Sequence, residues 1–267
     1  MQIIGNESYE NIFKRKSIRS FSGAPLSSEI KEKMAENIVL TNRASENMRI
    51  VIAKNKSGNI FKGMIGSYGA IRNADLYAAF IGKNNNNKAG YDIGYCGEAF
   101  ILSAISAGLG TCWISGTFKP DKVCKDINIS ENERIYAVTP LGYPAESEGG
   151  THKFMRFAIG SAKRKTIEQI SNISEVKNKQ EWMLSALEAL RVAPSARNMQ
   201  PWLVRFEDEK IVLLDERDQD LPNKSLDIEM GIAMLHLELG AYKNGRTGKW
   251  VYPVNSGKSK AYFELTR

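Results

Sequence analysis

The feature that most constrains the fold is a helix that is apolar on nearly every face. Residues 92–107 read DIGYCGEAFILSAISA, and Gly108 follows them as a stop signal. A helix on a protein surface shows one apolar stripe, so a helix without a polar face is buried on several sides. We therefore expect residues 92–107 to form a central helix packed between other elements.

A second helix of this kind is predicted at residues 227–239 and is expected to end at Gly240. The two helices belong to a short internal repeat, in which residues 97–101 (GEAFI) align with residues 231–235 (GIAML). Asn47-Met48 align in the same way with Asn198-Met199, each pair lying between a helix and a strand. The order helix, strand, buried helix therefore occurs twice.

The remaining elements are short. Helical spacing predicts helices at residues 9–13, from 25–28 onward and at 181–192, and residues 84–87 read as a loop. Strands are expected at residues 48–53, 76–81, 134–143, 202–206, 210–214, 249–254 and 260–265, the last two forming a hairpin around 255–257. This order favours an α+β fold with two tandem halves over a regular βαβ series.

Cysteine and histidine content limits the chemistry. The chain of 267 residues has three cysteines without a Cys-x-x-Cys pair, so we expect buried, reduced thiols and no metal site. It has two histidines, His152 and His236, which argues against a His-rich metal centre or a Ser-His-Asp triad. We expect His236 to be a hydrogen-bonded residue of the core.

The net charge of +7 raises the question of nucleic-acid binding. Lysines and arginines are scattered among 30 acidic residues, however, and the tight basic cluster is confined to residues 163–165. A protein that binds phosphorylated small molecules, or a solvated basic surface without a partner, explains the charge at least as well, and we expect no nucleic acid. Residues 1–7 do not resemble a secretory signal and no apolar run reaches about 20 residues, so we expect a soluble, cytoplasmic protein and no membrane.

Two basic motifs are candidates for binding phosphate. Residues 15–19 (RKSIR) supply three positive charges and a hydroxyl, and the planar arginine fork suits phosphate. Taken by charge alone, they could equally be the solvated end of the first helix. Residues 163–165 (KRK) are the second candidate, with a charged linker between the two halves as the alternative.

Two loops carry more specific patterns. Residues 193–202 (APSARNMQPW) contain prolines at both ends, so the loop is stiff and holds its polar side chains at a small ordering cost. Residues 108–116 (GLGTCWISG) are not a dinucleotide fingerprint, because Trp113 takes the place of the last glycine and a helix precedes them. Taken alone, Gly108 and Gly110 would be helix-stop glycines.

Together these motifs resemble the FMN-dependent nitroreductase family, and most closely its two-half subgroup labelled TM nitroreductases. Residues 15–19 followed by Phe21 are similar to the family's Arg-Arg-Ser-x-Arg opening, with Lys16 in place of the second arginine. Residues 108–116 resemble its Gly-Leu-Gly-Thr-Cys-Trp-x-Gly-Gly-Phe segment, and residues 164–168 a basic motif that lacks its proline at Thr166. The resemblance covers nearly the whole chain.

The resemblance implies a flavoprotein with FMN as cofactor and no catalytic side chain. It implies that NAD(P)H reduces the flavin at N5 and that a nitroaromatic or quinone is then reduced in a ping-pong exchange. It assigns the backbone of Ser115 and Gly116 to N5. It assigns the phosphate to Arg15, Lys16, Ser17, Arg19, Lys163 and Arg164, and the ring to Pro194, Ser195, Ala196, Arg197 and Asn198.

The family normally builds this site across a dimer, and this chain is similar to such a dimer fused into one polypeptide. The first half carries residues 15–19 but has NRASEN at 42–47 in place of Pro-Ser-x-x-Asn, and the second half has only the loop. We expect halves at residues 1–165 and 166–267, an intramolecular pseudo-dimer, one FMN between them and a chain that works as a monomer. A non-catalytic FMN carrier or sensor would have much the same sequence and stays open.

Overall fold

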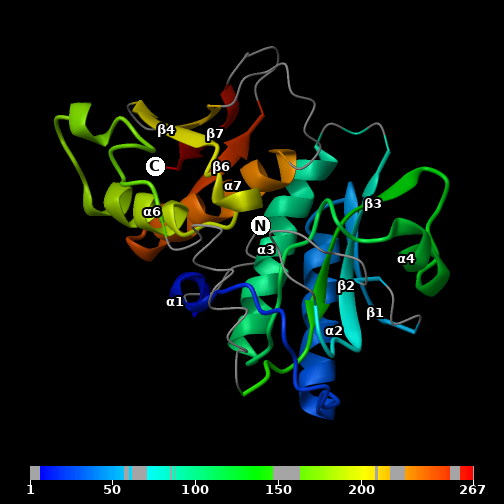
Figure 1. Ribbon diagram of the computed structural model, residues 1–267. Coiled ribbons are helices and arrows are strands. Elements are labelled where there is room, and N and C mark those ends of the chain that lie inside the picture. Colours follow the sequence, from blue (N-terminus) through cyan, green and yellow to red (C-terminus); the bar gives the residue numbers. More distant parts are fainter. Residues whose placement is uncertain are drawn as a thin grey trace.

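Two antiparallel sheets lie at opposite ends of the molecule, with helices between them (Figure 1). The computed structural model describes residues 7–56, 60–61, 71–84, 86, 88–146, 163–207, 210–216, 226–252 and 259–266. This is the nitroreductase-like α+β fold that the sequence predicts, with one sheet drawn from each half of the chain.

The first sheet has the strand order β1-β2-β3, formed by β1 (Met48–Lys54), β2 (Leu76–Lys83) and β3 (Glu133–Leu141). The middle strand is buried from Tyr77 to Gly82, which is why its sequence is apolar without alternation. Helix α2 (Ser28–Arg43) begins at the N-cap Ser27, whose Oγ accepts a hydrogen bond of 3.3 Å from the Ile30 N–H. The short α4 (Pro120–Asp126) lies at the outer side of this half (Figure 1).

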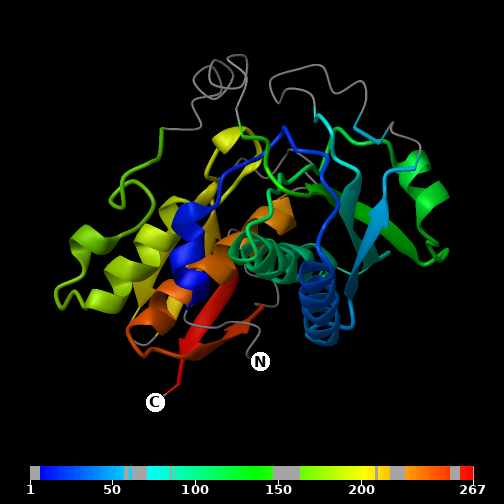
Figure 2. The same ribbon diagram turned by 90° about the horizontal axis from the view of Figure 1, so that it is seen from below.

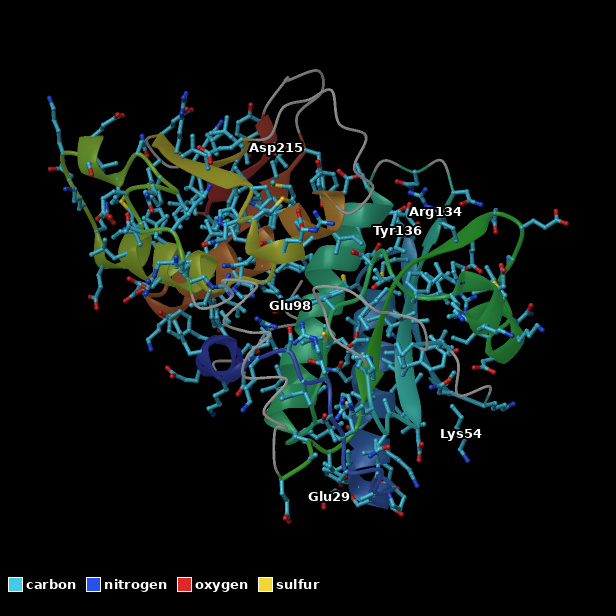
Figure 3. The ribbon with its side chains drawn as sticks, viewed as in Figure 1. Glu29, Lys54, Glu98, Arg134, Tyr136 and Asp215 are labelled. Carbon is cyan, nitrogen blue, oxygen red and sulfur yellow. The ribbon has the colours of Figure 1, made fainter. Side chains whose placement is uncertain are left out.

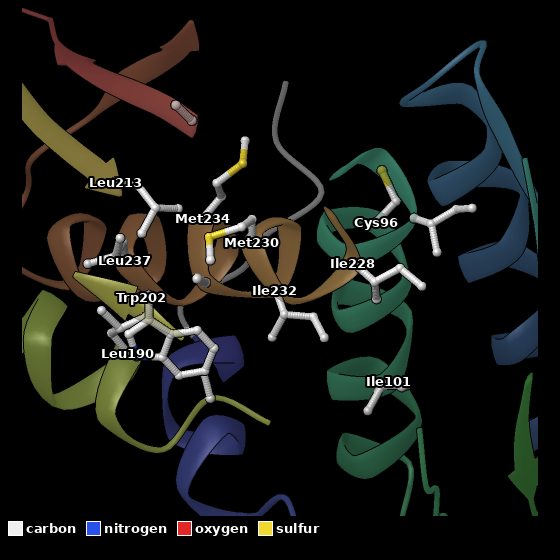
Figure 4. Close-up of a cluster of buried hydrophobic side chains, with 14 of the residues drawn as sticks. Cys96, Ile101, Leu190, Trp202, Leu213, Ile228, Met230, Ile232, Met234 and Leu237 are labelled. Carbon is white, nitrogen blue, oxygen red and sulfur yellow. The ribbon is translucent and has the colours of Figure 1, made fainter. Parts of the chain in front are cut away.

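The second sheet has the order β4-β5-β7-β6 and is formed by β4 (Trp202–Glu207), β5 (Lys210–Asp215), β7 (Ser259–Leu265) and β6 (Gly248–Val251). Strands β6 and β7 pair antiparallel, as the predicted hairpin requires, and its turn at 255–257 lies outside the described residues. Helix α6 (Glu181–Arg191) packs against α7 (Leu226–Lys243) beneath this sheet. Side chains of α7 such as Met234 and Leu237 fill the space toward Leu190, Trp202 and Leu213 (Figure 4).

The two apolar helices, α3 (Ala89–Ser106) and α7, cross at a pair of glycines in the middle of the protein. A Cβ on Gly94 would overlap the Ile228 carbonyl oxygen and lie 2.9 Å from the Cα of Gly231. A Cβ on Gly231 would in turn overlap the carbonyl oxygen of Tyr91. Glycine at both positions therefore lets the two backbones touch, and the predicted central helices form the boundary between the halves.

This reciprocal contact gives the internal repeat a spacing of 137 residues, from Gly94 to Gly231. Gly108 and Gly245 keep the same spacing and both have positive φ, +77° and +72°. The predicted alignment of Gly97 with Gly231 is therefore wrong by one helical turn. Gly97 instead faces Trp113 and Phe80 of its own half.

Two further expectations need correction. Helix α7 does not end at Gly240 but continues to Lys243. Gly240 lies against the backbone of α6, where an added Cβ would be 2.6 Å from the Ala186 nitrogen. The glycine therefore serves close helix packing rather than termination. Cys96 and Cys112 are buried free thiols as expected, whereas Cys124 on α4 is exposed.

The first helix, α1 (Glu7–Lys14), packs against α3 and also against α6 and α7 of the second half. Ile12 lies in a buried cluster with Leu102 of α3, Ala189 of α6 and Leu235 and Leu239 of α7. Figure 2 shows α1 beside α6 and α7. The residues that follow α1 are thereby carried to the boundary between the halves. No described helix is long and apolar enough to cross a membrane.

Candidate functional site

The predicted phosphate motif at residues 15–19 lies against the segment 108–116. The Ile18 N–H donates to the Thr111 carbonyl oxygen at 2.8 Å, and Ser17 forms a parallel bridge with Thr111. A Cβ on Gly110 would lie 2.8 Å from the Ile18 side chain, so Gly110 permits this close contact and only Gly108 has the positive φ of a helix stop. The structure thus brings together two motifs that are nearly 100 residues apart in sequence.

The loop at 193–202 is tied to the second basic motif. The Asn198 side chain donates to the Lys163 carbonyl oxygen at 2.7 Å, and the Lys165 N–H donates to Oε1 of Gln200 at 2.9 Å. The Lys165 ammonium also donates to the Gln200 carbonyl oxygen at 3.0 Å. The second basic motif therefore lies along the loop and holds its far end.

The backbone of this loop is strained. Arg197, Asn198 and Gln200 have φ values of +53°, +57° and +50°, in the left-handed region that side chains disfavour. Hydrogen bonds enforce the conformation, since Oγ of Ser195 accepts from the Gln200 N–H at 2.9 Å and Oε1 of Glu229 accepts from the N–H that follows Ser195 at 2.6 Å. Strained backbone of this kind clusters at ligand sites.

Three arginines converge beside the loop. The Arg164 guanidinium donates to the Ala193 carbonyl oxygen at 2.8 Å, just before the loop begins. Burial, and then the charges of Arg15 and Arg191, lower the pKa of Arg164 to about 10. A lowered pKa means that the cations repel one another in a poorly solvated place. An anion bound among them would remove that repulsion.

Two arginines of the first basic motif have unused hydrogen-bond donors. Nε of Arg15 and Nε of Arg19 are buried, and neither has a hydrogen-bond partner among the residues that the structure describes. The Arg15 side chain is only 7% exposed. A buried guanidinium nitrogen without a partner is costly, and a phosphate oxygen would satisfy it.

The other predicted site residues differ in their surroundings. Ser17 and Ser115 are half-buried, whereas Lys16, Lys163 and Gly116 are exposed. A Cβ on Gly116 would meet no atom within 4 Å, so the backbone there is open to a ligand. In the described part of the chain, no hydrogen bond or ion pair joins residues 115–116 to the arginine cluster.

A buried network around Glu98 was not expected from the sequence. Its Oε2 accepts from the Trp113 indole N–H at 2.6 Å, and its Oε1 lies 3.1 Å from Nε2 of His236 and 3.7 Å from Nε of Arg15. Glu98 lies in the middle of the molecule, between the two sheets (Figure 3). Its signal in the sequence was a lone carboxylate in the middle of an apolar helix.

The network places a charge in the core. Burial by itself would raise the pKa of Glu98, but the hydrogen bond from His236, the charge of Arg15 and the Trp113 bond together lower it, so the carboxylate is ionised. The prediction that His236 is a hydrogen-bonded core residue is confirmed, since it is fully buried. Among the described residues, no group of His, Cys, Asp and Glu could hold a metal ion.

Two sheets around crossed apolar helices, with a cationic site at their boundary, define the nitroreductase-like class of α+β proteins. The crystal structure of a nitroreductase described as putative, from Thermotoga maritima MSB8, has this fold, with a TM-score of 0.60 and 18% identity over 97% of this chain and 93% of that one. The sequence matches the family described as "Putative TM nitroreductase" over residues 7–241. The chain belongs to this family.

Other solved structures match about half of the chain. A nitroreductase family protein from Clostridium novyi NT shares 23% identity over 52% of this chain and 85% of that one, with a TM-score of 0.43. An FMN-dependent nitroreductase from Clostridium difficile R20291 shares 18% identity over 52% and 88%, with a TM-score of 0.42. No curated protein matches the sequence. Family membership supports a general oxidoreductase role.

Proposed function

We propose that this protein is an FMN-dependent NAD(P)H oxidoreductase with one FMN bound between halves at residues 1–165 and 166–267. When bound, FMN supplies hydride transfer through N5 between a nicotinamide and an acceptor such as a nitroaromatic or quinone. Because this chemistry belongs to the cofactor, the protein needs no acid or base of its own, and its residues bind and orient.

The observation that carries the proposal is the arginine cluster. Arg15 lies near the start of the first half and Arg164 at its end, yet the charge of Arg15 contributes to the lowered pKa of Arg164. The phosphate of FMN has a charge of about −1.5 to −2 near neutral pH and three acceptor oxygens. Burial and then the charges of Arg15 and Arg191 lower the pKa of Arg164, and a bound phosphate would counter both effects. Its oxygens would also accept hydrogen bonds from the Arg15 guanidinium and from the buried Nε of Arg19. The donor set therefore fits FMN.

The ring is assigned to the strained loop and to the open backbone. Residues 194–198 begin one residue after the carbonyl that Arg164 binds, so a ligand whose phosphate lies at the arginines would have its ring near this loop. Ser195 and Asn198 are half-buried and fixed by hydrogen bonds, which lowers the ordering cost of binding. The backbone of Ser115 and Gly116 is the candidate for contact with N5.

The repeat explains why one site and not two is proposed. The helix residues Asp92 and Glu229 have the 137-residue spacing, and each receives the loop of its own half. Glu229 accepts from the backbone N–H of Ala196, whereas Asp92 accepts from Oγ of Ser45 and from Nδ2 of Asn47, both at 2.7 Å. In the first-half loop, the Asn47 side chain is therefore hydrogen-bonded to the helix of its own half.

The second half also lacks a basic motif equivalent to residues 15–19. Residues 167–172 (IEQISN), which precede α6, contain no lysine or arginine, whereas residues 15–19 precede α2. Its asparagine side chain is hydrogen-bonded to Asp92, and residues 167–172 offer no counterpart of residues 15–19, so the pseudo-symmetric position lacks both predicted sets of ligand contacts. One complete site per chain follows.

A titration of the flavin-free protein with FMN tests the proposal. Replacing Arg164 by glutamine removes one charge-assisted contact, worth about 1.5–3 kcal/mol, so the Kd should rise roughly 10- to 100-fold. Arg205→Gln is the matched control, because this exposed arginine of β4 carries the same charge and lies outside the motifs assigned to FMN, and its Kd should stay within about twofold. Equal affinities for both variants would refute the phosphate assignment. A bound flavin that neither NADH nor NADPH bleaches would favour the carrier or sensor alternative.

A further inference from the structure

Arg15 needs a counter-charge that the proposed phosphate cannot supply before it binds. Arg15 affects Arg164 as a like charge, and Arg164 also feels Arg191. Arg191 has its own partner in Glu188 at 2.8 Å. Among the ion pairs of the described residues, Arg15 has one acidic partner, the buried Glu98. Without Glu98, repulsion would drive the Arg15 guanidinium out of the cluster.

The second half contributes His236 to this contact. Nδ1 of His236 lies 2.8 Å from the Ala189 carbonyl oxygen, which can only accept a hydrogen bond, so Nδ1 is the donor. Nε2 of His236 faces Oε1 of Glu98 at 3.1 Å, so the two side chains lie within hydrogen-bond distance across the boundary between the halves.

The same carboxylate fixes the other predicted flavin segment. The Trp113 indole N–H donates to Oε2 of Glu98, and the Trp113 ring stacks on Phe80 with centroids 4.4 Å apart. Trp113 lies two residues before Ser115 and three before Gly116 in the sequence. The buried Glu98 carboxylate thus contacts Arg15 of the proposed phosphate motif, Trp113 of the segment 108–116, and His236 of helix α7.

Helix α7 carries a second glutamate that can serve for comparison. Glu238 of α7 also accepts an indole N–H, from Trp250 at 2.9 Å, and a hydroxyl from the opposite helix, Tyr95 at 2.8 Å. No arginine contributes to its electrostatics, and burial raises its pKa, whereas the pKa of Glu98 is lowered. Glu98 is buried and Glu238 is half-buried, and the two share a hydrogen-bonding pattern. Of the two, only Glu98 faces a cation of the proposed site.

We propose that Glu98 is a positioning residue for FMN, which holds Arg15 and Trp113 in the geometry that the cofactor requires while His236 anchors it to the second half. The inference rests on the proposed FMN function. It makes Glu98 the link that keeps the phosphate grip preformed in the absence of the cofactor. Preformed sites bind more tightly because less ordering is required on binding.

The variant Glu98→Gln tests this assignment with little change of shape. The amide oxygen can accept from Trp113 and the amide nitrogen can donate to Nε2 of His236, so the hydrogen bonds survive in neutral form. The substitution therefore removes the negative charge beside Arg15 while it keeps the hydrogen-bond partners. A change in FMN affinity would then reflect the loss of the ion pair that positions Arg15.

FMN titrations should compare wild type, Glu98→Gln and the matched control Glu238→Gln. We expect the Kd for FMN to rise about tenfold or more in Glu98→Gln and to stay within about twofold in Glu238→Gln. The absorption spectrum of bound FMN should shift in Glu98→Gln alone, because the negative charge beside Arg15 and Trp113 is removed. In an Arg15→Ala background, Glu98→Gln should cause almost no further loss.

The outcomes separate the two proposals. If wild type binds no FMN, the proposed function fails and this inference fails with it. If wild type binds FMN and Glu98→Gln binds it equally or more tightly, only the positioning role is overturned. Equal losses in Glu98→Gln and Glu238→Gln would also overturn it, because both would then reflect core stability. Additive losses in the Arg15→Ala background would show that Glu98 acts independently of Arg15.

Discussion

Replacing Gly231 by alanine should destabilise the protein, although alanine normally stabilises a helix by about 1 kcal/mol relative to glycine. The added Cβ would overlap the Tyr91 carbonyl oxygen and lie 2.8 Å from the Tyr95 nitrogen and 2.9 Å from the Cα of Gly94. All three atoms belong to the backbone of α3, so no side chain can turn aside.

The magnitude follows from the separation that relief requires. Ordinary contacts to a Cβ begin near 3.4 Å, so α3 and α7 must separate by roughly 1 Å and loosen the side chains packed between them. Overpacking of a core costs about 1–3 kcal/mol, and rigid backbone atoms place this case at the upper end. The gain in helix propensity offsets part of this cost. We therefore expect the free energy of unfolding to fall by about 2 kcal/mol, which corresponds to roughly 4–8 °C in Tm for a protein of this size.

Urea unfolding of wild type, Gly231→Ala and Gly116→Ala measures the effect. Gly116 is the control because a Cβ there meets no atom within 4 Å, and its variant should stay within about 0.5 kcal/mol of wild type. Gly94→Ala should cost about as much as Gly231→Ala, and the double variant should cost less than the sum because the helices are already apart. A Gly231→Ala protein as stable as wild type would refute the close crossing of α3 and α7.

Two further predictions concern single side chains. Hydrogen bonds from Arg49 lower the pKa of Glu133 to about 2, so this pair stabilises the fold above the carboxylate's ordinary pKa and loses that effect as the pH falls from about 5 to 2. Because the pair is partly exposed, we expect it to contribute about 1 kcal/mol to the free energy of unfolding. The urea midpoint should fall less between pH 7 and pH 3 in Glu133→Gln than in wild type. An equal fall in both proteins would refute this prediction. With a thiol reagent, one cysteine per native chain should react quickly, because Cys124 is exposed while burial raises the pKa of Cys96 to about 12. All three should react after unfolding, and a fast reaction that persists in Cys124→Ser would contradict this assignment.

Much of the fold was predictable because it depends on local patterns. The uninterrupted apolar helices, the β-branched strands and the N-cap Ser27 each carry their own signal within a few residues. The continuation of α7 past Gly240 was not predictable, because it depends on how closely α6 approaches. The register of the repeat was missed for the same reason: several glycines in each helix could form the crossing, and only contact between the helices selects Gly94.

The candidate site was predictable as motifs but not as an arrangement. The resemblance identified residues 15–19, 163–165 and 193–202, and their roles toward FMN remain predictions. The convergence of Arg15 and Arg164 depends on α1 crossing to the second half, which is a tertiary effect with no local signal. Glu98 and His236 are separated by 138 residues, so their pairing follows only from the packing of α3 on α7.

The most direct test of the account is the amount of FMN per chain. The protein would be saturated with FMN, freed of excess, and denatured, and the released flavin would be quantified against chain concentration. The account predicts one FMN per chain, because among the residues that the structure describes one arginine cluster lies beside the Pro-Ser-Ala-Arg-Asn loop, whereas the first-half loop is hydrogen-bonded to Asp92. Two FMN per chain would contradict the closed pseudo-symmetric position, and no bound FMN would contradict the cofactor assignment itself.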